Sequence, residues 1–159
     1  MDEADLKRHI AYPLQRESRE LLEALRGTIL AIPESEWDCG ESKGAQPVRQ
    51  VGHLLYAIES YLGGHKARQG ERFGVCVESF KAAFDPVNCP RRETLLPWID
   101  EVEQIAMDGI DKAVRLSVTG AAKQHPPLHI PTYVLRHTVV HYTTLRIELE
   151  RRGLKLPDY

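Results

Sequence analysis

The chain has 159 residues, of which 42% are hydrophobic and 28% are charged, and these values are typical of one globular domain. Its formal net charge of −2 at pH 7 gives no electrostatic reason to expect a nucleic acid or an anionic membrane as a partner. No apolar segment approaches the roughly 20 residues of a membrane span, and the acidic start of the chain lacks the order of a signal peptide. We therefore expect a single cytoplasmic domain over residues 1–159.

Two long helices are expected in the first half of the chain. Apolar residues recur at helical spacing over residues 14–30, and a helical piece over residues 4–11 can lead into them. Residues 33–46, which hold two glycines, are expected to form a connecting loop. A second helix begins at Pro47 and runs to about Leu62, because proline suits a first helical turn and an apolar stripe follows it.

The segment over residues 70–88 has an irregular pattern broken by glycine and proline. Long loops in compact domains are often functional, so this one can cover a site. Disorder is the alternative, but Phe73, Val75, Phe80 and Phe84 indicate that the loop packs onto the protein.

Two further helices are expected in the second half. The third begins at Pro90 or Thr94, since an internal proline leaves both starts open, and it ends near Val118. The fourth runs from Thr132 to about Arg152, where basic residues and a glycine mark a helix end. Four amphipathic helices without a convincing strand predict an all-α bundle.

The three cysteines, Cys39, Cys76 and Cys89, are odd in number and show no CxxC spacing. This argues against a disulfide framework and against a thiolate zinc site, so buried or loop thiols are the preferred interpretation.

The most informative motif is a pair of histidines, His137 and His141, four residues apart in the fourth helix. On an α-helix this spacing places both rings on one face, where they can reach one metal ion. The pair is not an HExxH protease signature, because Thr138 occupies the position of the catalytic glutamate. Taken alone, the spacing also fits a solvated or a core-packed pair.

A second pair with the same spacing, His125 and His129, provides an internal comparison. Two prolines lie between these residues, so they cannot share a helical face and are expected in a loop. His9 is expected to be solvated, and His65 is explained by capping or exposure near a helix end.

His53 lies on the face of the second helix away from the apolar stripe, with Ala57, Ser60 and Gly64. Small residues beside a histidine indicate either close approach of another helix or a solvated face. A third histidine would favour a metal site over packed or pocket-lining imidazoles on the fourth helix, and His53 is the best candidate.

The order of these features resembles that of the DinB/YfiT-like superfamily of metal-dependent enzymes, which is distinct from the DNA polymerase that shares the DinB name. In architecture the resemblance spans nearly the whole chain. The recognisable motifs are PVRQVGHLL at residues 47–55, LRHTVVH at residues 135–141 and LERRGLKLP at residues 149–157.

The resemblance implies a four-helix bundle with long crossover connections, a homodimer, and a metal site made of His53, His137 and His141. Several subfamilies transfer low-molecular-weight thiols such as bacillithiol or mycothiol, or act as thiol-dependent isomerases or hydrolases. Members often carry a His-Arg-Gly-Gln-like run around the last ligand. Here Tyr142 follows His141, and this departure leaves the subfamily open.

We therefore expect a metal-dependent transferase or hydrolase that acts on a small molecule. Three imidazoles with an open position are typical of catalytic zinc, and imidazole also suits nickel, cobalt, copper and iron; zinc or nickel is expected. Such an ion lowers the pKa of bound water to about 7 or holds a thiol as thiolate. The candidate acid/base groups are Tyr142 and Glu148, followed by Tyr56, Tyr61 and Thr144.

Two hypotheses from other classes remain. The first is a non-catalytic bundle that binds a metal or a small ligand, for example in a stress response. The second is a bundle whose histidines only pack and which acts through a protein partner.

Overall fold

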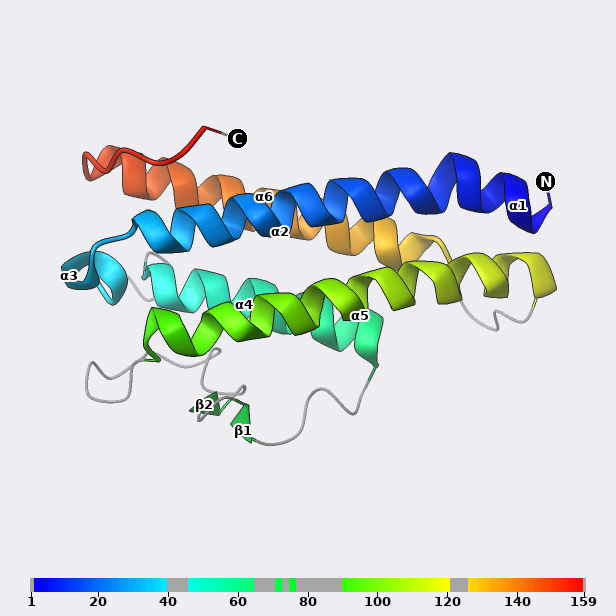
Figure 1. Cartoon of the computed structure of the whole chain (residues 1–159), viewed down its shortest axis with the longest axis horizontal. Coiled ribbons are helices and arrows are strands. Elements are labelled where there is room, and N and C mark those ends of the chain that lie inside the picture. The colour runs from blue at the N-terminus through cyan, green and yellow to red at the C-terminus, as the bar shows by residue number, and fades with distance from the viewer. Residues whose placement is uncertain are drawn as a thin grey trace.

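The computed structural model describes residues 2–39, 46–64, 71–72, 75–76, 90–120 and 126–158. In this part of the chain the protein is almost entirely helical, as expected for an all-α protein (Figure 1). The elements in chain order are α1 (Glu3–Leu6), the π-helical η1 (Lys7–Ala11), α2 (Tyr12–Ala31), α3 (Glu34–Trp37), α4 (Pro47–Ile58), the π-helical η2 (Glu59–Gly63), β1 (Glu71–Arg72), β2 (Val75–Cys76), α5 (Arg92–Thr119) and α6 (His129–Arg151).

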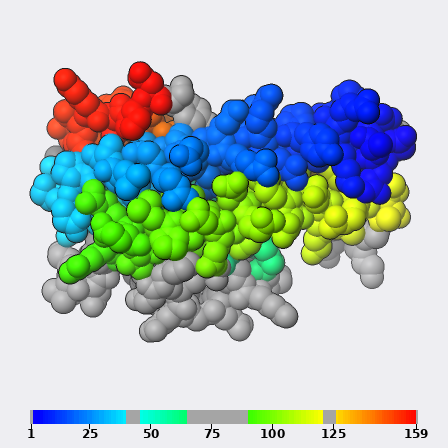
Figure 2. All heavy atoms as spheres, in the orientation of Figure 1, coloured from blue at the N-terminus to red at the C-terminus, as the bar shows by residue number. Residues whose placement is uncertain are grey.

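Four long helical segments, α2, α4 with η2, α5 and α6, lie roughly along one axis and pack around a shared core (Figure 1). On the face shown in Figure 2, α2 and α5 lie side by side. Among the described residues, the largest fully buried side chain is that of Trp98 on α5. Because each helix contributes an apolar stripe to the same core, the packing fixes which faces of α4 and α6 meet.

The first three helical elements form one continuous rod. Pro13 lies near the start of α2 and has no N–H to donate, so an unbroken α-helical ladder cannot pass through it. The π-helical turn η1 precedes it, and the Tyr12 N–H donates to the carbonyl of Lys7, five residues back. The helical piece expected at residues 4–11 is therefore fused to the first long helix.

The predicted loop regions contain short elements that the sequence pattern did not reveal. α3 lies within the loop expected at residues 33–46, and its buried Trp37 donates from Nε1 to the carbonyl of Pro90 at 2.6 Å. β1 and β2, of two residues each, pair antiparallel within the segment expected at residues 70–88, and the protein remains all-α in class. The other residues of that segment lie outside the described part of the chain.

The ends of the two longest C-terminal helices follow from glycine and proline. α5 ends at Gly120 and α6 ends before Gly153, and both glycines have a positive φ that other residues rarely adopt. α6 begins at His129, one turn earlier than expected at Thr132. The prolines before His129 do not prevent this, because a proline in the first turn or ahead of a helix removes no intrahelical hydrogen bond.

Charged pairs on the outside of the bundle join neighbouring helices. Arg19 pairs with Glu103 and Arg26 pairs with Asp100, and both pairs link α2 to α5. Within the described ranges, no helix is both long and apolar enough to cross a membrane.

Candidate metal centre

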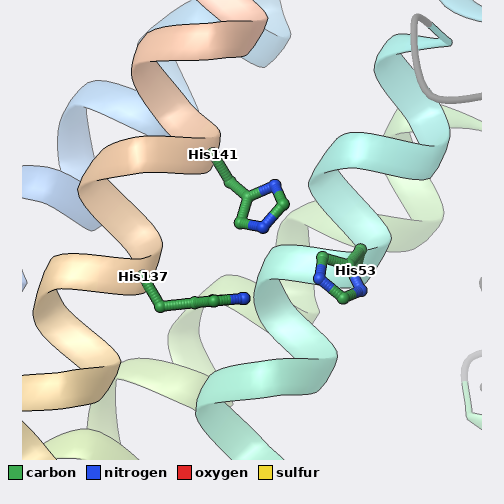
Figure 3. Close-up of side chains that lie close together, drawn as sticks. All are labelled: His53, His137 and His141. Atoms are coloured by element: carbon green, nitrogen blue, oxygen red, sulfur yellow. The ribbon is translucent and has the colours of Figure 1, made fainter.

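Three imidazoles from two helices converge at one point of the bundle. His53 lies on α4, and His137 and His141 point toward it from α6 (Figure 3). One ring nitrogen from each of the three lies within 4.8 Å of the other two. The ring centroids are separated by 5.4 Å between His53 and His137, 4.8 Å between His53 and His141, and 4.4 Å between His137 and His141. The residues named by the resemblance are thus neighbours in space.

Helix geometry explains this convergence. His137 and His141 are four residues apart, so α6 stacks their rings one turn apart on one face. α4 runs antiparallel to α6 and packs against it, which brings His53 opposite the pair (Figure 1). Beyond His53, Ala57 and Ser60 are only 4% and 5% exposed, so this face of the second helix is packed and not solvated.

The three imidazoles are partly buried, and burial disfavours their charged forms. Burial, followed by the neighbouring rings of His141 and His137 and the charge of Arg49, lowers the pKa of His53 to about 4. The pKa values of His137 and His141 are also lowered, mainly by burial. At neutral pH the cluster is therefore a set of neutral imidazoles, the form that ligates metals.

The arrangement fits a metal ion in two further respects. The buried Nδ1 atom of His137 has no hydrogen-bonding partner among the described residues, although buried polar atoms usually have one. The nitrogens around a tetrahedral zinc ion lie about 3.3 Å apart, as Zn–N distances of about 2.0–2.1 Å require. Because the ring nitrogens lie within 4.8 Å of one another, ion binding would bring them closer by at most about 1.5 Å.

Two neighbours of the cluster were not among the residues selected from the sequence. Gln50 on α4 places its Oε1 atom 3.2 Å from Nδ1 of His141. Tyr133 on α6 lies with its ring centroid 5.8 Å from that of His137. Helical spacing could have indicated both, since Gln50 precedes His53 by three residues and Tyr133 precedes His137 by four.

The two residues expected as catalytic acid/base groups lie away from the imidazoles. Tyr142 faces α2, where its buried hydroxyl lies 3.0 Å from Thr28 Oγ1 and donates to the carbonyl of Ala24 at 3.3 Å. Glu148 accepts hydrogen bonds from Arg152, which directly follows the end of α6. The structure does not bring either side chain to the three histidines.

The other candidate groups are distributed around the bundle. The ring of Tyr61 lies 5.3 Å from that of Tyr133 and so extends the aromatic edge beside the cluster. Tyr56 packs at the rim of the core. Thr144 is exposed, and its hydroxyl donates to the carbonyl of Val140.

The remaining histidines do not join the cluster where they are described. His9 is exposed, as expected. His129 was expected in a loop, but it is the first residue of α6 and stacks on Tyr133 at 6.5 Å. His65 and His125 lie outside the described residues.

Of the three cysteines, only one has a described side chain. Cys39 follows α3, is exposed, and donates from Sγ to the carbonyl of Ser35 at 2.9 Å. Cys76 lies in β2, and Cys89 is outside the described residues.

Comparison of the chain with protein-family models, with curated proteins and with solved structures gives no match.

Proposed function

We propose that this protein is a metal-dependent enzyme of the DinB/YfiT-like type, with His53, His137 and His141 as its metal ligands. The observation that carries the proposal is the convergence of the three imidazoles, whose ring nitrogens lie within 4.8 Å of one another. Packed or solvated histidines need no such convergence. The proposal includes the bundle topology of that superfamily, with a long crossover connection, and its homodimeric assembly.

The ligand set indicates the kind of chemistry. When bound, a zinc or nickel ion would supply Lewis acidity and lower the pKa of water or of a thiol. The three imidazoles are neutral, and no carboxylate belongs to this cluster in the described part of the chain. They leave the positive charge of the ion uncompensated, and Arg49 adds its own charge near His53. This environment favours an anionic ligand, such as the thiolate of a small thiol, and supports a thiol transferase or a hydrolase acting on a small molecule.

The aromatic residues beside the cluster suit substrate orientation. Tyr133 lies next to His137, and Tyr61 lies next to Tyr133, so two aromatic rings extend from the imidazoles. Tyr142 and Glu148 already have other hydrogen-bonding partners, Thr28 for Tyr142 and Arg152 for Glu148. We therefore do not assign proton transfer to either of them.

Metal analysis of protein purified without a histidine tag tests the proposal. We expect one divalent ion per chain, and we expect His137→Ala to lose it. His9→Ala removes an exposed imidazole outside the cluster and is the matched control, which should keep the ion. A wild-type chain that binds no stoichiometric ion from zinc or nickel solution would contradict the proposal and favour histidines that only pack.

A non-catalytic metal-binding bundle is the second candidate, because the geometry supports ion binding more directly than turnover. The metal-loaded protein should be assayed for transfer of small thiols to electrophiles and for hydrolysis of small esters and amides. Turnover that disappears in His137→Ala supports the enzyme. An occupied site without any turnover supports the binding protein.

A further inference from the structure

The histidine cluster contains one imidazole whose orientation is set by another side chain. Gln50 Oε1 lies 3.2 Å from Nδ1 of His141, and the contact joins α4 to α6. Gln50 precedes His53 by three residues on the same helix and is partly buried. The residue that contacts the ring of His141 is therefore carried by the helix that supplies His53.

The chemistry of this contact selects one tautomer. A carboxamide oxygen only accepts hydrogen bonds, and a neutral imidazole has one nitrogen that donates and one that accepts. A hydrogen bond to Oε1 therefore requires the proton of His141 on Nδ1. The lone pair then lies on Nε2, and this nitrogen becomes available to an ion.

The other imidazole that α6 contributes to the cluster, that of His137, differs in this respect. The buried Nδ1 of His137 has no partner, so no protein group in the described part of the chain fixes its tautomer. The two rings come from one helix and lie 4.4 Å apart, but only that of His141 is oriented through Nδ1.

We propose that Gln50 is a positioning residue of the metal centre, which holds His141 with Nδ1 protonated and with Nε2 as the ligating atom. This role rests on the proposed function. A hydrogen bond to the outer nitrogen of a ligating histidine fixes the ring and raises its basicity, and loss of such a partner typically weakens metal binding about 10–100-fold. Because the carboxamide is neutral, it orients the ring without reducing the positive charge of the centre.

Three variants test the role of Gln50. Gln50→Leu removes the acceptor at similar size, and Gln50→Glu replaces it with a stronger acceptor. Gln15→Leu is the matched control, because Gln15 is also partly buried and bonds across helices, to Asp111, but does not contact the cluster.

Two readouts are needed. The first is the ¹⁵N chemical shifts of the His141 ring in the metal-free protein, which identify the tautomer. The second is the Kd for zinc by competition titration. We expect the Nδ1–H tautomer in wild type and in Gln50→Glu, and a mixture of tautomers in Gln50→Leu. The Kd should rise about 10–100-fold in Gln50→Leu, and it should stay the same or fall in Gln50→Glu. Gln15→Leu should keep the wild-type Kd.

Other outcomes overturn the role and are separable from failure of the proposed function. Zinc binding by a wild-type protein whose His141 carries its proton on Nε2 overturns this assignment alone. So does an unchanged Kd in Gln50→Leu. If Gln50→Leu does not fold, the wild-type tautomer and the zinc Kd of Gln50→Glu still test the role of Gln50. Weaker zinc binding by Gln50→Glu would contradict an acceptor role. If wild type binds no zinc or nickel, the proposed function fails and this role fails with it.

Discussion

Burial and neighbouring charge both lower the pKa of His53. Its pKa falls from the ordinary value of 6.5 to about 4, because burial and the neighbouring imidazoles and Arg49 disfavour a proton there. The unfolded chain has no such environment, so between these two pH values it binds protons that the folded chain does not. By linkage, acidification through this range stabilises the unfolded state relative to the folded state.

We expect the metal-free protein to keep its full stability above about pH 6.5 and to lose part of it as the pH falls from there to about 4. The measurement is the urea midpoint of unfolding in the presence of a chelator, across this pH range. In His53→Gln the decrease should be smaller, because one group with a lowered pKa is gone and its neighbours lose a repulsive partner. His9→Gln serves as the control. Equal decreases in wild type and in His53→Gln would contradict a pH-linked role for His53.

Tyr142 lies on α6, as His137 and His141 do, but it has a structural role. Its hydroxyl contacts Thr28 and the carbonyl of Ala24 and accepts a hydrogen bond from Arg146 at 3.2 Å. Tyr142→Phe should lower the free energy of unfolding by about 1–3 kcal/mol, because the hydroxyl of fully buried Thr28 loses its partner. Urea unfolding measures this loss. The zinc Kd should not change, and a weakened Kd with unchanged stability would instead place Tyr142 in the metal centre.

At the scale of elements, the π-helical segment η2 continues α4 beyond His53 and packs closely against α5. A Cβ added at Gly109 of α5 would lie 2.8 Å from the Cβ of Leu62 and 3.3 Å from its carbonyl oxygen. Neither atom is the free end of a flexible side chain. The absence of a side chain at Gly109 therefore permits the close approach of the two helices.

Gly109→Ala should be destabilising even though alanine favours a helix. The gain in helix propensity is about 1 kcal/mol, whereas overpacking a tight contact costs about 1–3 kcal/mol, so a net loss of up to about 2 kcal/mol is expected. Gly27→Ala is the matched control within α2, where the added Cβ would meet only Pro157 Cγ at an ordinary 3.8 Å. That control should gain about 0.5–1 kcal/mol. Urea unfolding of both variants gives the comparison, and equal stabilisation would contradict the close packing.

At the scale of the whole molecule, the long helices could be predicted because their apolar residues recur with one period and their ends carry glycine or proline. The three metal ligands could not be predicted from periodicity alone. The spacing of His137 and His141 indicates a shared face, but only the packing of α4 against α6 places His53 opposite them. Which face of α6 meets α2 depends on tertiary packing as well, and for that reason the position of Tyr142 was not predictable from spacing.

The short elements α3, β1 and β2 could not be predicted from sequence periodicity either. α3 has four residues and each strand has two, too few for a periodic pattern to form. Trp37 is buried by contact with the chain before α5, and this contact is distant in sequence. Gln50 could be placed on the face of His53 from spacing alone. Its contact with His141 depends on how close the two helices lie.

A metal ion held by α4 and α6 would join two helices that are far apart in sequence, so binding should stabilise the whole bundle. A ligand that binds only the folded state adds about 2.7 kcal/mol at a free concentration of about 100 times its Kd. For a chain of this size, that corresponds to a rise in Tm of about 5–10 °C. Thermal unfolding with and without zinc measures the shift, which should be lost in His53→Gln and kept in His9→Gln.

Loss of the shift in His53→Gln requires the ion to bridge both helices, because a site made of His137 and His141 alone would remain intact on α6. A shift of wild-type size in His53→Gln would therefore show that the ion binds elsewhere or on one helix only, and the three-histidine centre would be wrong.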